Sequence, residues 1–484
     1  MKNSFFKKGT LYFVNTIIGA LITVISTKIF AIYISPEEYG VYSVFYSFYA
    51  MIVNLLFITF SQSSLRLYYD YEKDDDKKQK FFGTYFLTLL IIFFIIAVIV
   101  IFILPLFKEI IGENLYYSLF LLFGVLLIPD GLKEVMFSFE RCKEKPVKEL
   151  LGNSLNMITK LLVFFLIFFI INKSVVSIVW GSICGSIVCC IFLINKKYIK
   201  SVSFKNFDKD LLKKIFAYGL PLVGVPIVNY LLSTSDQLII KLICSDYDTG
   251  VYAMGYKISH SLFSLITSFL ITAGHPIIMK LYKKFGMEKA SEFTIRLSFL
   301  YFAICLPCLV EVLVFNNYVI SILSSSAYND SAFVLVVASF GIVLAGYINY
   351  CNKPWEITLK SGMITVFSLV GAIANVVLNF IFVPIYGFNA AAVTTIVSYF
   401  IVVVLSRICS RKIMKLSLPF KDMIILILIN GALFGYLYMM NYFVSNIFHF
   451  ILVAASGLII YCIIFILLFK KNIQYFKKIN IIGE

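Results

Sequence analysis

Five lysines lie inside long apolar stretches of this 484-residue chain. A lysine at the centre of a bilayer costs about 2.5–3.5 kcal/mol on helix insertion. We therefore expect such lysines to face a polar cavity between helices or to reach the membrane surface. A cavity lined by ammonium groups attracts anions, which suggests an anionic cargo. The five residues are Lys28, Lys133, Lys160, Lys241 and Lys257.

The composition is that of a membrane protein. Hydrophobic residues make up 61% of the chain, charged residues only 14%, and the mean hydropathy is +0.93. Soluble domains carry about 25% charged residues, and apolar runs of about 20 residues, long enough to span a bilayer, recur along the whole chain. A net charge of +16 would indicate nucleic-acid binding in a soluble protein. In this chain, the net positive charge is explained by the positions of the Lys and Arg residues relative to the predicted membrane spans.

The apolar runs predict an all-α polytopic membrane protein with about 14 transmembrane helices. If the N-terminus is cytoplasmic, 35 of the 42 Lys and Arg residues fall in inside segments and only Lys108 and Lys173 fall outside. This bias predicts an N-in, C-in topology. The first span has no cleavage site and is expected to be retained. The predicted spans are 10–34, 40–65, 82–107, 115–138, 149–171, 174–195, 214–244, 250–278, 293–315, 328–351, 356–383, 388–410, 422–441 and 447–469.

An internal repeat relates the two halves. Residues 35–46 read SPEEYGVYSVFY and residues 245–256 read SDYDTGVYAMGY, at an offset of 210. Each copy follows the first predicted helix of a six-helix block, so the blocks would be parallel repeats with a substrate site between them, as in secondary transporters. The domains expected are an N-terminal six-helix bundle, a basic cytoplasmic linker, a C-terminal six-helix bundle, and two additional helices with a basic tail. Their bounds are 1–195, 196–213, 214–412 and 413–484.

Several motifs resemble those of a known family. The Ser-Pro-Glu-Glu-Tyr-Gly-Val-Tyr turn from Ser35 is similar to the opening of Wzx-like bacterial polysaccharide flippases, of the multidrug/oligosaccharidyl-lipid/polysaccharide exporter superfamily. The resemblance covers nearly the whole chain. It implies two six-helix bundles and two extra helices around a central cavity, and translocation of undecaprenyl-diphosphate-linked oligosaccharides. The other matching motifs are Tyr218-Gly219-Leu220-Pro221, Asp236 ahead of Gly250-Val251-Tyr252, Asn375-x-x-x-Asn379 before Pro384, and Tyr386-Gly387-Phe388-Asn389-Ala390-Ala391-Ala392.

The resemblance and the helical spacing together suggest cavity residues. The family implies that helices 1, 2, 7 and 8 line the cavity, and a rise of 1.5 Å per residue places Lys28, Asp236 and Lys257 about 9–12 Å below the outer surface. Polar residues that recur at helical spacing indicate inward faces. Such stripes include Asn153, Asn156 and Lys160; Asn229, Ser233 and Asp236; and Lys257, His260 and Ser264. The substrate-binding candidates are Lys28, Lys160, Lys257, Asp236, Arg66 and Lys241.

Most candidates also have a simpler structural interpretation. Asp236 is either an ion-pair partner of a lysine or a proton or cation site for coupling, and His260 is a packed polar residue or a proton relay. Arg66 could meet an entering phosphate or fix the topology, and Lys241 is close enough to the outer end to snorkel. Lys133 is expected to form a local ion pair.

Three further groups are expected to have structural roles. The partners expected for Lys133 are Asp130 and Glu134. Asn375 and Asn379 are expected to join helices, and Glu311 to lie at the rim of the cavity. The C-x-x-C of Cys305 and Cys308 has no second ligand pair, so no metal or redox site is predicted.

The leading functional hypothesis is a lipid-linked oligosaccharide flippase, which is a transporter and not an enzyme. The alternatives are a multidrug exporter or another lipid-linked precursor exporter of the same superfamily, including one for the cell-wall precursor. A membrane glycan polymerase or ligase is disfavoured because no large outer loop is predicted. No G-x-x-x-x-G-K-[ST] loop is present, which disfavours ATP-driven transport.

The expected setting follows from that hypothesis. No cofactor, catalytic residue, metal or nucleic acid is expected. The partners predicted are the lipid-linked oligosaccharide, membrane lipids, a proton or sodium counter-ion, and polysaccharide polymerases and glycosyltransferases. The predicted location is the bacterial cytoplasmic (inner) membrane, as a multi-pass protein.

Overall fold

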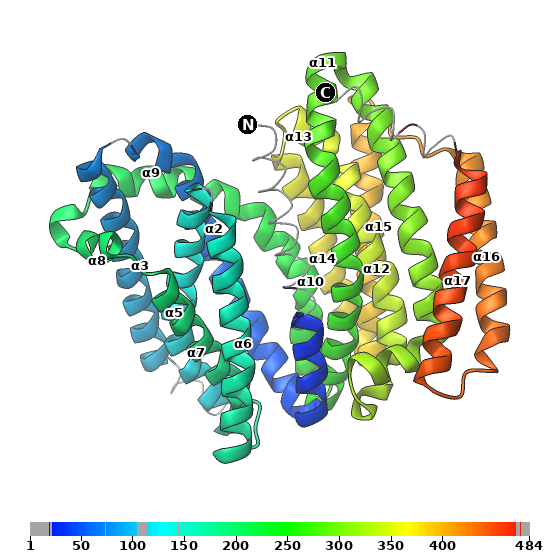
Figure 1. Ribbon diagram of the computed structural model, residues 1–484, viewed down its shortest axis with the longest axis horizontal. Helices are drawn as coiled ribbons and strands as arrows, with labels where there is room; N and C mark the ends of the chain where they lie inside the picture. The colour runs from blue at the N-terminus through cyan, green and yellow to red at the C-terminus, as the bar shows by residue number, and fades with distance from the viewer. Residues whose placement is uncertain are drawn as a thin grey trace. The chain divides into compact units, whose positions relative to one another are not determined.

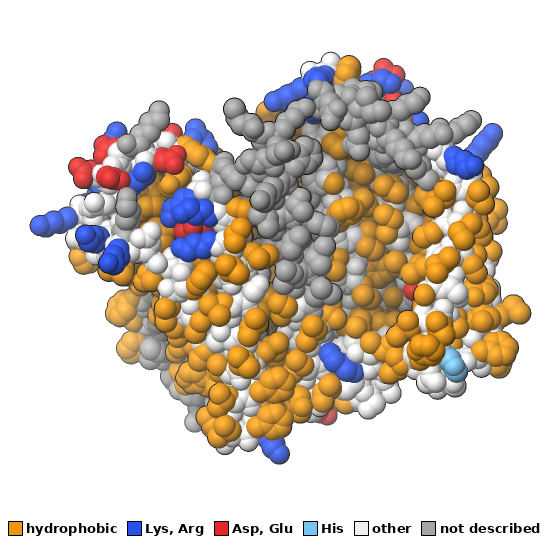
Figure 2. Space-filling model, in the orientation of Figure 1, with side chains coloured by type: hydrophobic (Ala, Val, Ile, Leu, Met, Phe, Trp, Pro, Cys, Tyr) orange, Lys and Arg blue, Asp and Glu red, His pale blue; other side chains and the backbone are white. Residues whose placement is uncertain are grey.

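The computed structural model describes residues 19, 22–72, 74–103, 114–143, 145–470 and 475. These residues form helices and turns, with no strand among them. Ten of the described helices are long and apolar enough to cross a membrane, or eleven when one bent pair counts as a single span. On the face drawn in Figure 2, hydrophobic side chains cover the helix flanks while most Lys and Arg side chains lie near the helix ends. The all-helical membrane class is confirmed.

The helix bounds follow the predicted spans closely in most places. One predicted span, 388–410, coincides with α15, whereas the number of fourteen spans and the N-in, C-in topology stay predictions. The elements, labelled as in Figure 1, are α2 (Pro36–Tyr71), α3 (Asp75–Ile103), α5 (Asn114–Cys142), α6 (Pro146–Ile170), α7 (Val176–Leu193), α8 (Lys196–Ser201), η2 (Phe204–Asn206), α9 (Lys209–Gly219), η3 (Leu220–Val223), α10 (Gly224–Ile243), α11 (Asp246–Leu323), η4 (Ser326–Ser331), α12 (Ala332–Cys351), α13 (Lys353–Ile357), α14 (Gly362–Tyr386), α15 (Phe388–Ser410), α16 (Phe420–Asn441) and α17 (Ile447–Leu468).

Two predicted spans differ in continuity from the structure. The span expected over 214–244 is divided into α9, η3 and α10, with a bend of 42°. Pro221 and Pro226 cannot donate the backbone hydrogen bonds that a straight helix needs there. Conversely, α11 runs through two predicted spans with a break at Gly286, whose φ of 79° suits glycine.

The chain divides into two compact units, which we describe separately. Unit 1 includes Ile34–Lys241 and Ser245–Gly250, and contains α2, α3 and α5 to α10. Unit 2 includes Thr27–Tyr33, Leu242–Cys244 and the chain from Val251 onward. A short segment just before each copy of the repeat thus belongs to unit 2, while the start of each copy belongs to unit 1. The domain bounds expected from the sequence stay a prediction.

In unit 2, the two last helices pack on the second half of α11. Their shared core includes Phe299 of α11, Leu426 and Leu433 of α16, and Tyr461 of α17. The Tyr461 hydroxyl donates a hydrogen bond to the Ala303 carbonyl at 2.6 Å. Figure 1 shows α16 and α17 side by side. Both helices are therefore integral to unit 2.

The predicted linker is folded onto unit 1. It contains α8, η2 and the start of α9. The Tyr198 hydroxyl of α8 donates to Glu140 Oε1 of α5 at 3.0 Å, and the Lys143 ammonium lies 4.4 Å from the centre of the Tyr198 ring. Burial lowers the pKa of Lys143 and raises that of Tyr198. These contacts attach the start of the linker to the end of α5.

Both copies of the internal repeat begin with a serine that caps a helix. Ser35 Oγ accepts a hydrogen bond from the backbone N–H of Glu38 at 3.3 Å, and α2 begins at the next residue. Ser245 Oγ accepts one from the backbone N–H of Asp248 at 3.1 Å, and α11 begins at the next residue. An N-cap serine satisfies a backbone donor that the first helical turn leaves unpaired. The repeated sequence thus produces the same local structure twice.

The two repeat copies also touch through glycines. A Cβ atom at Gly40 would lie 2.9 Å from the backbone nitrogen of Gly250, and a Cβ at Gly250 would lie 2.9 Å from that of Gly40. Each would also overlap a carbonyl oxygen, that of Asp246 or that of Pro36. Only glycine permits this reciprocal contact between the first turns of α2 and α11.

We predict that Gly40→Ala and Gly250→Ala each destabilise the protein. The added methyl group must displace backbone atoms, and overpacking of this kind costs about 1–3 kcal/mol. Thermal unfolding of the purified protein in detergent measures the effect. Gly431→Ala in α16 is the matched control, because a Cβ there meets nothing within 4 Å. Equal melting temperatures for Gly40→Ala and Gly431→Ala would contradict the prediction.

Candidate functional site

A polar cavity of about 550 Å³ lies within unit 1. Helices α2, α5, α6 and α7 form its walls. Five charged side chains line it although these helices are otherwise apolar, which is the pattern expected of a membrane protein that handles a polar ligand. The charged lining residues are Asp130, Lys133, Glu134, Arg141 and Lys160.

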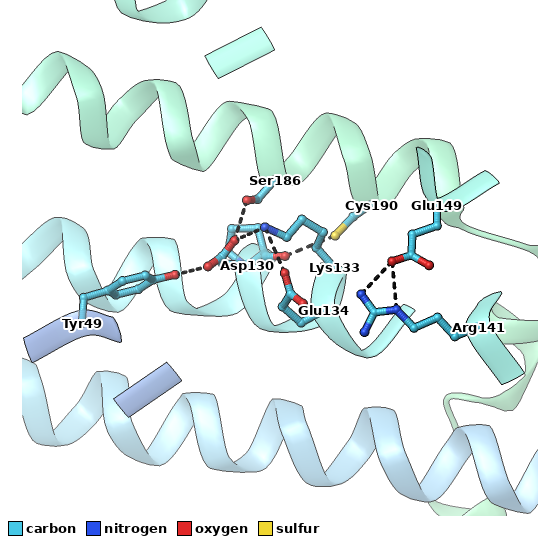
Figure 3. Close-up of polar contacts among 9 residues, drawn as sticks. Tyr49, Asp130, Lys133, Glu134, Arg141, Glu149, Ser186 and Cys190 are labelled. Atoms are coloured by element: carbon cyan, nitrogen blue, oxygen red, sulfur yellow. Dashed lines mark hydrogen bonds and ion pairs between the residues drawn. The ribbon is translucent and has the colours of Figure 1, made fainter. Parts of the chain in front are cut away.

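Three of these charges form a cluster on α5 (Figure 3). The Lys133 ammonium lies 2.5 Å from Asp130 Oδ1 and 3.5 Å from Glu134 Oε1. Ser186 of α7 donates to Asp130 Oδ1 at 3.0 Å, and the Tyr49 hydroxyl of α2 donates to Oδ2. The ion pair predicted for Lys133 is confirmed. The cluster joins α2, α5 and α7. Its three charged residues also line the cavity, so the cluster forms part of the cavity wall.

Lys160 and Asn156 line the same cavity from α6. Their placement depends on the close packing of α6 against α7, which carries Gly181-x-x-x-Gly185. A Cβ at Gly181 would lie 2.5 Å from the Lys160 carbonyl oxygen, and one at Gly185 would lie 2.6 Å from that of Asn156. Small residues at this spacing let membrane helices approach closely. Of the predicted stripe of Asn153, Asn156 and Lys160, the last two line this cavity, and the binding role of Lys160 stays a prediction.

A row of tyrosines on α2 forms part of the wall, and the sequence analysis missed it. Tyr42, Tyr46 and Tyr49 recur at i, i+4 and i+7, which places them on one helix face. The rings of Tyr42 and Tyr46 stack with centroids 5.8 Å apart, and those of Tyr46 and Tyr49 lie 6.1 Å apart. The spacing alone could have revealed this face. Arg141 was missed because it lies at the end of α5, beyond the predicted span.

Lys28 belongs to unit 2, where it contacts the end of α11. Its ammonium donates to the Ser321 carbonyl at 2.5 Å and also to the Ser324 carbonyl. Carbonyl groups in the last turn of a helix lack intrahelical donors, and a cation there is favourable. Lys28 therefore has a capping role, and its contact with substrate stays a prediction.

The other predicted residues lie outside the cavity lining. Asp236 is fully buried in α10, Lys257 of α11 is partly buried, and His260 stacks on a neighbouring tyrosine ring. Lys241 forms an ion pair with Asp246, and Arg66 lies 3.7 Å from Asp70 in an exposed pair. The structure thus brings only Lys160, among the predicted binding residues, to this cavity. The roles of the others stay predictions. So does the rim position of Glu311.

The predicted helix–helix contact of two asparagines is confirmed in unit 2. Asn375 of α14 donates from Nδ2 to Thr395 Oγ1 of α15 at 3.2 Å. Asn379 donates to Asn375 Oδ1 at 3.2 Å and accepts a hydrogen bond from Thr394. All four side chains are buried. Interhelical polar contacts of this kind join membrane helices.

Cys305 and Cys308 are free thiols on α11. Within the described ranges, no group of three or more His, Cys, Asp or Glu side chains is placed to hold a metal ion. The candidate functional site is the polar cavity of unit 1.

Comparisons with solved structures show that this fold is a known one. The fold is similar to that of the lipid II flippase MurJ in an inward closed conformation, with a TM-score of 0.76 and 16% identity over 96% of this chain and 100% of that one. A multidrug resistance MATE family transporter of the MOP superfamily, in an inward-facing conformation, gives a TM-score of 0.58 at 13% identity over 84% and 94% of the two chains. The fold is thus the one that these two transport proteins share.

Residues 5–282, more than half of the chain, match the family model described as polysaccharide biosynthesis protein. The chain belongs to this family. The capsular polysaccharide biosynthesis protein CapF of Staphylococcus aureus is 20% identical over 59% of this chain and 72% of its own length. An uncharacterized membrane protein of Methanocaldococcus jannaschii is 24% identical over 46% of this chain and 44% of its own length, so less than half of that relative is matched. The resemblance to polysaccharide flippases is confirmed at the level of the family.

We predict that Lys133→Met lowers the free energy of unfolding by about 3–5 kcal/mol, because it leaves Asp130 buried without its cation. The double variant Asp130→Asn/Lys133→Met should recover most of this loss. Thermal unfolding of the single and double variants in detergent measures the coupling. If the two substitutions are additive instead, Lys133 does not act through Asp130.

Proposed function

We propose that this protein is a flippase that translocates an undecaprenyl-diphosphate-linked oligosaccharide across the bacterial cytoplasmic membrane for surface polysaccharide synthesis. The observation that carries the proposal is the charged cavity of unit 1, enclosed by helices that are otherwise apolar. The family of polysaccharide biosynthesis proteins supports the substrate class. The similarity to a lipid II flippase supports a lipid-linked cargo.

The chemistry of the cargo fits such a cavity. A diphosphate group carries about two negative charges, and burying them without compensation in an apolar medium is prohibitive. Cationic side chains such as Lys160 offset that cost. Tyrosine rings, such as those of α2, offer faces on which sugar rings can stack. Alternating access would then carry the head group past the apolar core while the lipid tail stays in the membrane.

The remaining predictions belong to this proposal. Lys28, Lys257, Lys241 and Arg66 are further candidates for binding the cargo, and Asp236 and His260 are candidates for coupling to a proton or sodium gradient. The chain would cross the membrane fourteen times with both ends inside. Glycosyltransferases that make the cargo and a polymerase that consumes it would be its partners.

A second function is favoured by a different feature of the same cavity. Asp130, Glu134 and the tyrosines of α2 are groups that bind organic cations, through charge and through ring faces. The MATE family transporter supports this reading through its fold. Efflux of ethidium from cells that produce the protein would favour a multidrug exporter. We expect none, because Lys133 pairs with both carboxylates and offsets one of their two negative charges.

We predict that Lys160→Ala reduces the translocation rate at least tenfold in liposomes that contain a lipid-diphosphate oligosaccharide. Removing the ammonium leaves the diphosphate less well compensated in the cavity. Lys173→Ala is the control, because Lys173 is exposed in a loop. Appearance of the glycan at the outer surface is the measurement. Wild-type protein that gives no translocation would contradict the proposed function, whereas an unimpaired Lys160→Ala variant would contradict the role of Lys160.

A further inference from the structure

Arg141 is a cationic residue in the last turn of α5, close in sequence to the start of α6. Arg141 lines the cavity, and its side chain is 41% exposed. Both Nε and Nη2 donate to Glu149 Oε1 of α6, at 2.8 and 2.7 Å (Figure 3). Glu149 is not a lining residue, and its side chain is only 7% exposed. Of this pair, only Arg141 therefore lines the cavity, and the side chain of Glu149 is buried.

The pairing of the two groups is incomplete. Arginine and a carboxylate usually form two parallel hydrogen bonds that use both carboxylate oxygens. Here both N–H groups converge on one oxygen, and Glu149 Oε2 is buried without a hydrogen-bond partner in the described part of the chain. Glu149 thus holds the guanidinium in place without using its full capacity as an acceptor.

Lys133, another cation of the cavity, is placed differently. It is compensated by two carboxylates that themselves line the cavity, so an anion near Lys133 would be repelled by Asp130 and Glu134. The carboxylate that compensates Arg141 belongs to Glu149, which is buried and does not line the cavity. An anion in the cavity can therefore reach the guanidinium without meeting a negative group of this pair.

We propose that Arg141 is the residue that binds the diphosphate group of the cargo, and that Glu149 is both its support and its competitor. The planar guanidinium matches phosphate oxygens geometrically, as a lysine does not. A diphosphate offers more acceptor oxygens than the single oxygen that Glu149 now supplies. The inference rests on the proposed function for the identity of the cargo, but the anion site itself can be tested alone.

The test uses calorimetry to measure the binding of inorganic pyrophosphate to the full-length protein in detergent. Arg141→Ala should weaken binding at least tenfold, because charge-assisted hydrogen bonds are lost. Glu149→Gln should tighten binding severalfold, because the competitor loses its charge while the side chain keeps its shape. The opposite directions are the diagnostic result. A purely structural ion pair would respond in the same direction to the loss of either member.

The pair Arg296–Glu292 of unit 2 provides matched controls, since its groups lie 3.4 Å apart outside this cavity. Arg296→Ala and Glu292→Gln should leave pyrophosphate affinity unchanged. If Arg141→Ala does not fold, Arg141→Lys replaces it and should also weaken binding, because a lysine lacks the fork of donors.

Three results would overturn the inference: no pyrophosphate binding by the wild-type protein, unchanged binding by the Arg141 variant, or a Glu149→Gln effect in the same direction as that of Arg141→Ala. None of these results decides the proposed function, which the liposome assay tests separately. Conversely, pyrophosphate binding with the predicted pattern, but no lipid translocation, would retain the anion site and reject the flippase.

Discussion

The structure of unit 1 depends on compensating buried charge inside apolar helices. Lys133 is 8% exposed and is held by two carboxylates of its own helix. Moving such an ammonium out of water is favourable only if close partners replace the lost hydration. The hydrogen bonds from Tyr49 and Ser186 to Asp130 extend this compensation to α2 and α7. A charge that could have prevented insertion thus fixes the positions of three cavity walls.

Glycine provides the second condition for the cavity. Gly181 and Gly185 let α7 approach the backbone of α6, and this brings Lys160 to the wall. In a membrane, lipid tails compete with apolar side chains, so helix association depends on close packing and interhelical polar contacts. The cavity therefore coexists with tight packing beside it. A larger residue at either glycine would separate α6 from α7 and move Lys160 with it.

The sequence predicted those features that depend on local pattern. The bounds of α15 and the ion pair of Lys133 both follow from neighbouring residues. The bend between α9 and α10 was not predicted, because the apolar run over 214–244 continues without a break through Pro221 and Pro226. The residues that line the cavity could not all be predicted. Whether Asp236 or Lys160 faces a given space depends on which helices pack together, and single-helix periodicity does not contain that information.

The cavity is less cationic than the count of intramembrane lysines implied. Two of its five charged lining residues are carboxylates, and Arg141 has a third carboxylate, Glu149, behind it. A strongly cationic site would bind a diphosphate tightly, and tight binding of the cargo slows its release on the far side. A binding site that is nearly neutral overall, with its carboxylates hydrogen-bonded to its own cations, can accept an anion by exchanging partners. In the proposed transport cycle, the carboxylates would compete with the cargo for the same cations and would return to them when the cargo leaves. Near-neutrality of the cavity is thus consistent with the proposed transport of an anion, because a transporter must bind its cargo and also release it.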